Sequence, residues 1–500
     1  MLGCLLQLLH ALFNAVALVK RYAYATFETM KRFIIPISIT LLFVIMIVVQ
    51  GCKKESFITS SDALLRTSVD TLHYDTVFTS IGSITQSFKI FNSNDQKLKL
   101  SNVQLMGGSS SFFKINVDGV AGTAFNDIEI NGNDSIYVFA TVNINPNAAN
   151  LPFVVQDSIR ITYNGNTKFV QLDALGLNAN FLRNKRITTD STWTNNRPYV
   201  ILGNVSVDSG KTLTINKGCR IYFHADAPMI VNGTLKAIGA KDDVDRIKFN
   251  GDRLDEPYKN FPASWPGIYF NSSSKDNLMQ YCIIKNAYQG TIVQNPPPLP
   301  NTNTKLVLQE TILDNIFDVA VGGSNTSISA RNCLISNSGY NVYLTAGGNY
   351  SFNHCTIASY GNNYLPHKYP VLTISNVASA NITLPLNCSI KNSIIYGEGG
   401  LAEDEIAIIK QGNTAFAATF DNVLYKMKNA DPAVAIFTGT KLRNVAPLFD
   451  SIDIGNRKFN FRLSPASPCI NKGVNSGLLF DLDGNNRSIG LPDLGCYEKQ

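Results

Sequence analysis

Residues whose types and spacing could support catalysis are few in this 500-residue chain. Glu310, Asp314 and Asp318 lie close together, and Lys285 precedes them. Carboxylates gathered on one face could bind calcium beside a lysine base, which is the arrangement that a polysaccharide lyase needs. Asp314 and Asp318 flank a predicted turn, so we expect them to face different sides. We therefore predict no catalytic residue here, and keep a lyase or glycoside hydrolase acting on acidic polysaccharide as an alternative function.

A second acidic segment could bind a metal ion. Asp481, Asp483 and Asn485 are spaced like the first ligands of a calcium loop, but Asn486 and Pro492 stand where an EF-hand has glycine and glutamate. Because calcium needs six or more oxygen ligands, we predict a structural turn instead. The nine cysteines include no Cys-x-x-Cys pair, which argues against zinc. We expect neither a metal nor a cofactor.

Aromatic residues gather in one of three segments that interrupt an otherwise regular pattern, namely 290–305, 359–370 and 397–405. The middle segment holds the residues that we predict to line a ligand-binding face, which are Tyr360, Tyr364, His367 and Tyr369. Exposed rings can stack on the apolar faces of sugars, and His367 could contact acidic sugars. The alternative is that the tyrosines pack their own segment against the rest of the protein.

The N-terminal region carries a targeting signal. Residues 33–49 form an apolar run that follows two basic residues and leads into the sequence Val-Gln-Gly-Cys, which ends at Cys52. A basic segment, an apolar segment and a cleavage site together are typical of a signal peptide. The segment resembles the lipobox of bacterial lipoprotein signal peptides. This implies that residues 30–51 are removed and that Cys52 carries a lipid. The alternative is a single transmembrane helix.

The residues on either side of this signal are also informative. Met30 is the expected start, so we interpret residues 1–29 as an over-extended gene model, the alternative being a pair of membrane helices. Residues 52–69 are mostly polar and predict a tether. The net charge of +6, from 43 basic and 37 acidic residues, is too small for a nucleic-acid partner. The expected partner is the membrane, through the lipid, and the oligomeric state is left open.

Residues 70–177 predict a β-sandwich. Short strands alternate apolar and polar residues, and turn signals such as Asn164-Gly165 separate them. The sequences Phe-Lys-Ile-Phe-Asn-Ser (88–93), Phe-Ala-Thr-Val (139–142) and Ile-Arg-Ile-Thr-Tyr (159–163) resemble immunoglobulin-like domains of the abnormal-spindle/Hydin type. The resemblance implies a fold and no activity.

Residues 178–450 contain a repeat of about 22 residues with insertions. One small residue opens each copy, and the copies start at Cys282, Thr311, Cys333, Cys355 and Ser393, which are 29, 22, 22 and 38 residues apart. Asparagines tolerant of the left-handed backbone region follow four residues later, at Asn286, Asn315 and Asn337. Such a period is typical of a solenoid. The region resembles the right-handed parallel β-helix family, with a β-propeller or a second sandwich as alternatives.

Cysteines recur at the strand positions of this repeat. They are Cys219, Cys282, Cys333 and Cys355, and we predict that they are stacked, buried thiols. The last segment, 451–500, contains Ser-Pro-Ala-Ser-Pro-Cys and Pro-Asp-Leu-Gly-Cys-Tyr-Glu and resembles the choice-of-anchor Q ending of secreted β-helix proteins. The resemblance implies a C-terminal cap. Cys469 and Cys496 replace residues that are often alanine in that family, and we expect a disulfide between them.

Together these patterns predict an all-β protein in which an immunoglobulin-like sandwich precedes a right-handed parallel β-helix. The expected location is the cell envelope, with the lipid in the outer membrane of a Gram-negative bacterium. The expected function is non-catalytic binding of a polysaccharide or another surface interaction. An adhesive or structural surface protein is the second alternative, after the enzyme.

Overall fold

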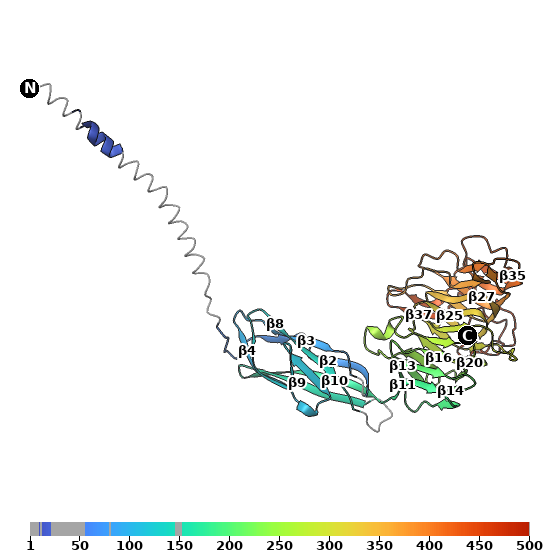
Figure 1. The fold of residues 1–500 in the computed structure, drawn as a ribbon, viewed down its shortest axis with the longest axis horizontal. Helices are drawn as coiled ribbons and strands as arrows, with labels where there is room; N and C mark the ends of the chain where they lie inside the picture. The colour runs from blue at the N-terminus through green and yellow to red at the C-terminus, as the bar shows by residue number, and fades with distance from the viewer. Residues whose placement is uncertain (1–9, 11–12, 22–55, 80–81, 146–152, 500) are drawn as a thin grey trace, which may run out of the picture.

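The structure, a computed structural model, describes residues 10, 13–21, 56–79, 82–145 and 153–499. Figure 1 shows a smaller β-body that follows the N-terminal segment and a larger one that contains the C-terminus. The predicted signal peptide and Cys52 lie outside the described residues. Within the described ranges, no helix combines the length and apolar character needed to cross a bilayer.

The smaller body is a sandwich of two five-stranded sheets. One sheet has the order β1 (Leu65–Thr67), β3 (Gln86–Asn92), β8 (Ser135–Val142), β5 (Phe113–Val117) and β6 (Val120–Gly122). The other has the order β2 (Thr71–Phe78), β10 (Asn166–Leu177), β9 (Phe153–Tyr163), β4 (Leu98–Leu105) and β7 (Ala124–Ile130). All pairings are antiparallel except β2 with β10, which is parallel. The predicted sandwich is thus present.

Local sequence explains the turns and the start of this body. Asn164 and Gly165 have φ values of 46° and 81° and connect β9 to β10, as the Asn-Gly pair predicts. Residues 56–69, the described part of the expected tether, are folded and do not form a free linker. Phe57 bridges to Lys97, and β1 pairs with β3, so residues 56–69 belong to the sandwich. Ala63 is buried in its core, which anchors a segment that its polar composition made look free.

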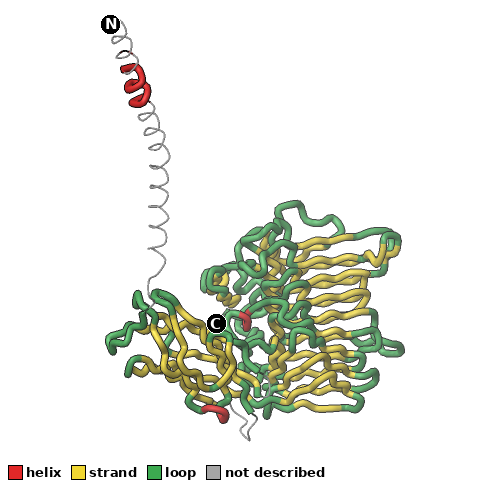
Figure 2. Tube along the Cα trace, turned by 60° about the vertical axis from the view of Figure 1, so that its left-hand side comes forward, coloured by secondary structure: helices red, strands yellow, loops and turns green. Residues whose placement is uncertain are grey.

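The larger body is a parallel solenoid of 23 strands, seen as stacked coils in Figure 2. It begins with β11 (Asn180–Ile187), β12 (Ser191–Trp193) and β13 (Tyr199–Val207). The first face then contains β16 (Met229–Val231), β19 (Ile268–Phe270), β22 (Thr291–Gln294), the first halves of β25 (Val319–Arg331) and β27 (Tyr340–Asn353), β29 (Leu372–Ser375) and β33 (Ile406–Ile409). Each coil from β16 to β33 adds one strand to this face, so positions on it repeat along that part of the array.

Two further faces complete each coil. The second contains β14 (Thr212–Asn216), β17 (Thr234–Ile238), β20 (Asn277–Gln280), β23 (Leu306–Gln309), the second halves of β25 and β27, and the first parts of β32 (Leu386–Gly397), β34 (Phe416–Tyr425) and β35 (Ile436–Arg443). The third contains β15 (Arg220–Phe223), β18 (Ile247–Gly251), β21 (Cys282–Lys285), β24 (Ile312–Asp314), β26 (Leu334–Ser336), β28 (Thr356–Ser359) and the ends of β32, β34 and β35.

The predicted repeat register is confirmed on the third face. Ile283 pairs with Ile312, Leu334 pairs with both Ile312 and Thr356, and Thr356 pairs with Ile394. The residues that open the copies therefore stack in one buried column, which contains Cys282, Thr311, Cys333, Cys355 and Ser393. The cysteines are free thiols, as predicted. Ile247 and Val423 occupy the same buried column in other coils, so the position accepts β-branched as well as small side chains.

The predicted asparagine ladder is confirmed at the corner between the third and first faces. Asn286, Asn315 and Asn337 all have positive φ, at 62°, 59° and 45°. Asn315 Nδ2 donates to Asn286 Oδ1 at 2.7 Å, and Asn286 Nδ2 donates to Asn250 Oδ1 at 2.9 Å. Amide-to-amide hydrogen bonds thus link Asn250, Asn286 and Asn315, whereas Asn337 Nδ2 donates to Asp314 Oδ1 at 3.4 Å.

The C-terminal segment, residues 445–499, is called the strap below. After the hairpin of β36 (Phe449–Asp453) and β37 (Lys458–Leu463), it packs along the outer side of the third face. Phe461 and Cys496 share a core with Ile394 and Leu424. Figure 1 accordingly places the C-terminus beside the middle of the array and away from β35. The expected cap is thus a lateral cover, because outward apolar residues on the third face need burial.

Candidate functional site

The structure separates the four residues predicted to line a ligand-binding face. Tyr364 and Tyr369 are 42% and 45% exposed, whereas Tyr360 and His367 are 7% and 2% exposed. Tyr360 packs against Phe449 and Phe461 of the strap. His367 Nε2 lies 2.9 Å from Glu405 Oε1, and both groups are buried. The expected exposure was therefore wrong for Tyr360 and His367, and ligand contact stays a prediction for Tyr364 and Tyr369.

Tyr369 belongs to a row of aromatic side chains at the edge of the first face. We call this the aromatic row, and successive coils supply it with Tyr288, Phe317, Tyr340 and Tyr369. Tyr288 and Phe317 stack with centroids 5.5 Å apart, and Tyr340 and Tyr369 with centroids 4.4 Å apart. Tyr288, Phe317 and Tyr369 are each 45% exposed. Stacking fixes the rings in place, so a ligand would not have to order them.

Sequence reasoning missed three members of this row, although a signal was present. Tyr288 and Phe317 each follow a ladder asparagine by two residues, and Tyr340 follows Asn337 by three. Because the ladder corner was predicted, aromatic residues two or three positions after it could be expected close to that corner on successive coils.

A polar cleft of about 280 Å³ lies beside the ladder corner. Asparagines of the ladder, together with Lys285 and Asp314, form one side. The turn between β36 and β37 contributes Arg457 and Lys458 from the other side. Strand and strap thus meet around a cleft that holds three cationic groups and one carboxylate.

Lys285 and Asp314 neutralise one another at this site. Lys285 Nζ lies 2.9 Å from Asp314 Oδ2, and the carboxylate raises the pKa of Lys285. Ser336 Oγ also donates to Asp314 Oδ1 at 2.7 Å. A lysine held in its ammonium form is not prepared to act as a base, because proton abstraction needs the neutral amine. The pair favours binding and positioning.

Tyr364 lies next to the same cleft, in contact with its lining residue Arg457. Its ring centroid lies 4.7 Å from that of Phe261, and the Arg457 guanidinium carbon lies 4.5 Å from the Tyr364 centroid. A cation above a ring attracts its electron-rich face, which orients both groups. The predicted residues Tyr364, Lys285 and Asp314 therefore come together with Arg457, which the sequence gave no reason to place here.

The other acidic residues considered for catalysis lie elsewhere. Glu310 sits at the corner between the second and third faces, where Arg331 Nε lies 3.3 Å from its carboxylate. Asp318 accepts a 2.8 Å hydrogen bond from Gln289 Nε2. Glu310 and Asp314 lie at opposite ends of one short strand, so the three carboxylates do not form a common site. Across the described ranges there is no group of three or more His, Cys, Asp or Glu side chains suited to a metal ion.

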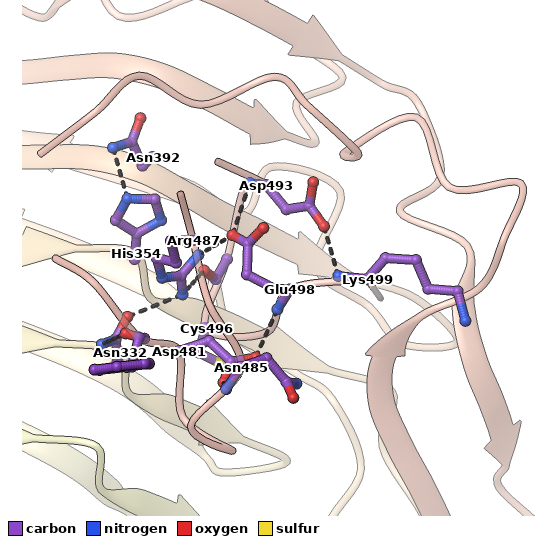
Figure 3. A network of polar contacts seen from close by, with 12 residues as sticks. Asn332, His354, Asn392, Asp481, Asn485, Arg487, Asp493, Cys496, Glu498 and Lys499 are labelled. Carbon is purple, nitrogen blue, oxygen red and sulfur yellow. Dashed lines mark hydrogen bonds and ion pairs between the residues drawn. The ribbon is translucent and has the colours of Figure 1, made fainter. Parts of the chain in front are cut away.

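The second acidic segment is part of a buried polar network, shown in Figure 3. Asp481 accepts hydrogen bonds from the backbone nitrogens of Asp483, Asn485 and Glu498 and from the Asn485 amide. These donors occupy the oxygen lone pairs that calcium would require, in keeping with the predicted turn. Burial raises the pKa of Glu498 to about 7.

The same network holds the strap on the third face. Arg487 is fully buried and donates to Asn332 Oδ1 at 2.9 Å, to the Gly495 carbonyl at 3.1 Å and to Glu498. Cys469 and Cys496 are free, so the expected disulfide is absent from the structure. The Cys496 amide donates to Thr356 Oγ1 at 3.1 Å, which directs this residue to the solenoid. Buried polar contacts, and not a disulfide bond, attach the strap to the third face.

Comparisons with known proteins add little to this geometry. No family model and no curated protein sequence matches the chain. Among solved structures, a family 123 glycoside hydrolase from Clostridium perfringens matches 23% of this chain and 26% of its own at 14% identity and a TM-score of 0.17. A PapD-like domain of human CEP192 matches 25% of this chain and 93% of its own at 9% identity and a TM-score of 0.17.

A third similar structure is the alkylpurine DNA glycosylase AlkC of Pseudomonas fluorescens, solved with DNA that contains an abasic-site analogue. It matches 23% of this chain and 31% of its own, at 11% identity and a TM-score of 0.15. The chain thus spans about a quarter of the hydrolase and less than a third of the glycosylase. Scores this low carry no weight in the argument below.

Proposed function

We propose that this chain is a lipid-anchored protein of the bacterial cell envelope that binds an acidic polysaccharide without modifying it. In this proposal Cys52 carries the lipid in the outer membrane. The sandwich is immunoglobulin-like, the solenoid is a right-handed parallel β-helix, and the strap is a choice-of-anchor Q-type ending. The observation that carries the function is the cleft, where three cations and several amides surround one neutralised carboxylate, and where the half-exposed Tyr364 ring contacts one of the cations.

The chemistry of the cleft fits an acidic sugar. Lys458 and Arg457 lie on the strap side, and charge-assisted hydrogen bonds from such groups recognise carboxylates and sulfates. The ladder amides can donate to and accept from sugar hydroxyl groups. Tyr364 and the aromatic row add ring surface at the rim and along the adjoining first face. The coils hold the ladder amides, Lys285 and Asp314, and a short hairpin turn holds Arg457 and Lys458, so little entropy is lost on binding.

Removal of the strap cations tests this proposal. Full-length protein in detergent is titrated with oligogalacturonate, sulfated and neutral glycans by calorimetry. Because each charged hydrogen bond contributes about 1.5–3 kcal/mol, the double variant Arg457→Gln/Lys458→Gln should bind acidic glycans at least tenfold more weakly. The matched control is Arg183→Gln/Lys185→Gln, an exposed pair on β11. Equal affinity of the two double variants would show that the cleft is not the binding site. Failure of every glycan to bind the wild type would contradict the proposed function.

A further inference from the structure

A groove of about 830 Å³ lies at the corner between the first and second faces, away from the cleft. Its floor is a row of outward residues on neighbouring strands, which are Ser327, Asn349, Asn387 and Ala417. One wall is part of the insertion 290–305, and another contains Pro385 and Phe416. None of the described residues that line it carries a charge.

The insertion that forms the wall is fixed at its base. Lys305 is fully buried, and its ammonium group donates to the carbonyls of Gln294, Asn295 and Ser272 at 2.7, 3.2 and 3.2 Å. Burial lowers the pKa of Lys305 to about 8. One end of the insertion thus closes on the other, which makes the wall a fixed part of the fold.

The exposed part of the insertion is fixed as well. Asp276 accepts hydrogen bonds from the amides of Asn301 and Asn303 at 2.8 and 2.9 Å, and these bonds lower the pKa of Asp276. Between the two anchors Leu299 is 87% exposed at the groove. A large apolar side chain left in solvent on a braced loop is available for a partner.

The floor of the groove offers hydrogen bonds that the protein does not use. Asn387 Nδ2 donates to Asn349 Oδ1 at 3.0 Å, which leaves Asn349 Nδ2 and Asn387 Oδ1 without a partner among the described residues. Ser327 to Ala417 spans three strand intervals, or about 14 Å at roughly 4.8 Å each.

We propose that this groove is a second binding site, specific for an uncharged, extended polysaccharide segment. Free amides and hydroxyls match sugar hydroxyl groups, and Leu299, Pro385 and Phe416 match the apolar faces of sugar rings. An extended peptide would need an open sheet edge, but Asn349 and Asn387 lie in strands paired on both sides. The absence of charge on the lining favours a neutral chain over an acidic one.

This site is independent of the cleft, and the experiment separates the two. Full-length protein in detergent is titrated with cellohexaose, xylohexaose, mannohexaose and oligogalacturonate. Asn387→Ala should reduce binding of a neutral hexaose about tenfold and leave oligogalacturonate binding unchanged. Leu299→Asp, at a fully solvated loop tip, should do the same without affecting folding. Arg457→Gln/Lys458→Gln should show the opposite pattern, which distinguishes failure of the groove from failure of the cleft.

Asn216→Ala is the matched control, since Asn216 is exposed on the second face in an early coil. It should bind every ligand like the wild type. The inference is overturned if no neutral hexaose binds, or if both groove variants bind neutral sugars like the Asn216 variant. It is also overturned if decapeptides from a random library bind in an Asn387-dependent way while sugars do not.

Discussion

His354 shows how one buried residue sets the response of the protein to acid. It has φ 51° in a turn position where neighbouring coils carry Asn332 and Asn392, and its Nε2 accepts a 2.9 Å hydrogen bond from Asn392 Nδ2. Burial, with Arg487 nearby, lowers the pKa of His354 to about 2. Histidine therefore stays neutral in the folded protein at any pH that the protein normally meets.

The stability of the solenoid should fall in acid because of His354. An unfolded histidine titrates near pH 6.5, so below that pH the unfolded chain binds a proton that the folded chain does not bind. The contribution is complete above pH 6.5 and decreases by about 1.4 kcal/mol per pH unit below it. Asparagine suits the same turn but does not titrate. In urea denaturation, the free energy of unfolding of His354→Asn should therefore fall less than that of the wild type between pH 6.5 and 4.5.

Glu498 provides the internal check on this pH experiment. Its raised pKa acts in the opposite direction, because the folded chain binds the proton between about pH 4.5 and 7 and loses stability as the pH rises. Both the wild type and His354→Asn retain it, so the difference between their pH profiles isolates His354. Parallel profiles for the two proteins would contradict the assignment of a neutral, buried imidazole.

Cys52 is the residue on which the proposed location depends. If it is the lipidated first residue of the mature chain, a palmitate analogue fed to cells should label the protein, and Cys52→Ala should abolish the label. Cys469→Ala is the control, since this buried thiol should leave labelling unchanged. Label that persists in the Cys52 variant would contradict lipidation at Cys52, and a wild type without label would favour the transmembrane anchor.

Residue type alone could not tell which predicted tyrosines are exposed. Tyr364 and Tyr360 have the same chemistry and lie four positions apart, but one meets solvent and the other meets Phe449 and Phe461 of the strap. The strap lies about 90 residues further along the chain. No local pattern at Tyr360 encodes that long-range contact, and the same holds for Arg457 beside Tyr364.

At the scale of the element, the ladder corner can be tested by its backbone and its side chain separately. Asn315→Ala loses two amide hydrogen bonds and places alanine at φ 59°, so we expect a loss of about 2–3 kcal/mol in unfolding free energy. Asn315→Gly loses the same hydrogen bonds but adopts positive φ without strain. It should be the more stable variant by about 1 kcal/mol in urea denaturation.

The order of these two variants decides between two explanations of the ladder. Stability in the order Asn, Gly, Ala means that backbone conformation and amide bonds both matter. Alanine equal to or better than glycine would show that the turn relaxes on substitution, and that positive φ is not what keeps asparagine there.

The coils were the most predictable part of the fold. The copies that start at Cys282, Thr311 and Cys333 each open with a small residue, continue with β-branched or leucine residues and end near an asparagine. This local pattern is enough to set the register of each coil. The strap was predicted only as a unit, because its packing depends on outward residues of the third face such as Leu334 and Leu424. Those residues look like ordinary strand positions in the sequence.

At the scale of the whole molecule, one buried arginine should decide whether the strap stays attached. Arg487→Ala leaves Glu498 buried without its partner, so we expect a loss of about 3–5 kcal/mol and cleavage of residues 464–499 in limited proteolysis. The control is Arg462→Ala, also in the strap but exposed, with its guanidinium 2.7 Å from Asp483. That pair is on the surface and should cost less than about 1 kcal/mol.

Two readouts make this comparison decisive. Mass spectrometry locates the cut, and circular dichroism shows whether the coils persist after it. Equal protease sensitivity of the two variants would mean that apolar packing, through residues such as Phe461 and Leu494, holds the strap without help from the network.

The lateral strap also fixes the order in which the chain can be completed. The coils precede the strap in the chain, so each coil can pair with the one before it as soon as it emerges from an export channel. The outer side of the third face must wait for the strap, residues 445–499. During that interval Leu334, Ile394 and Leu424 are uncovered, and a nascent chain that stalls or is truncated there would present an adhesive stripe to its neighbours.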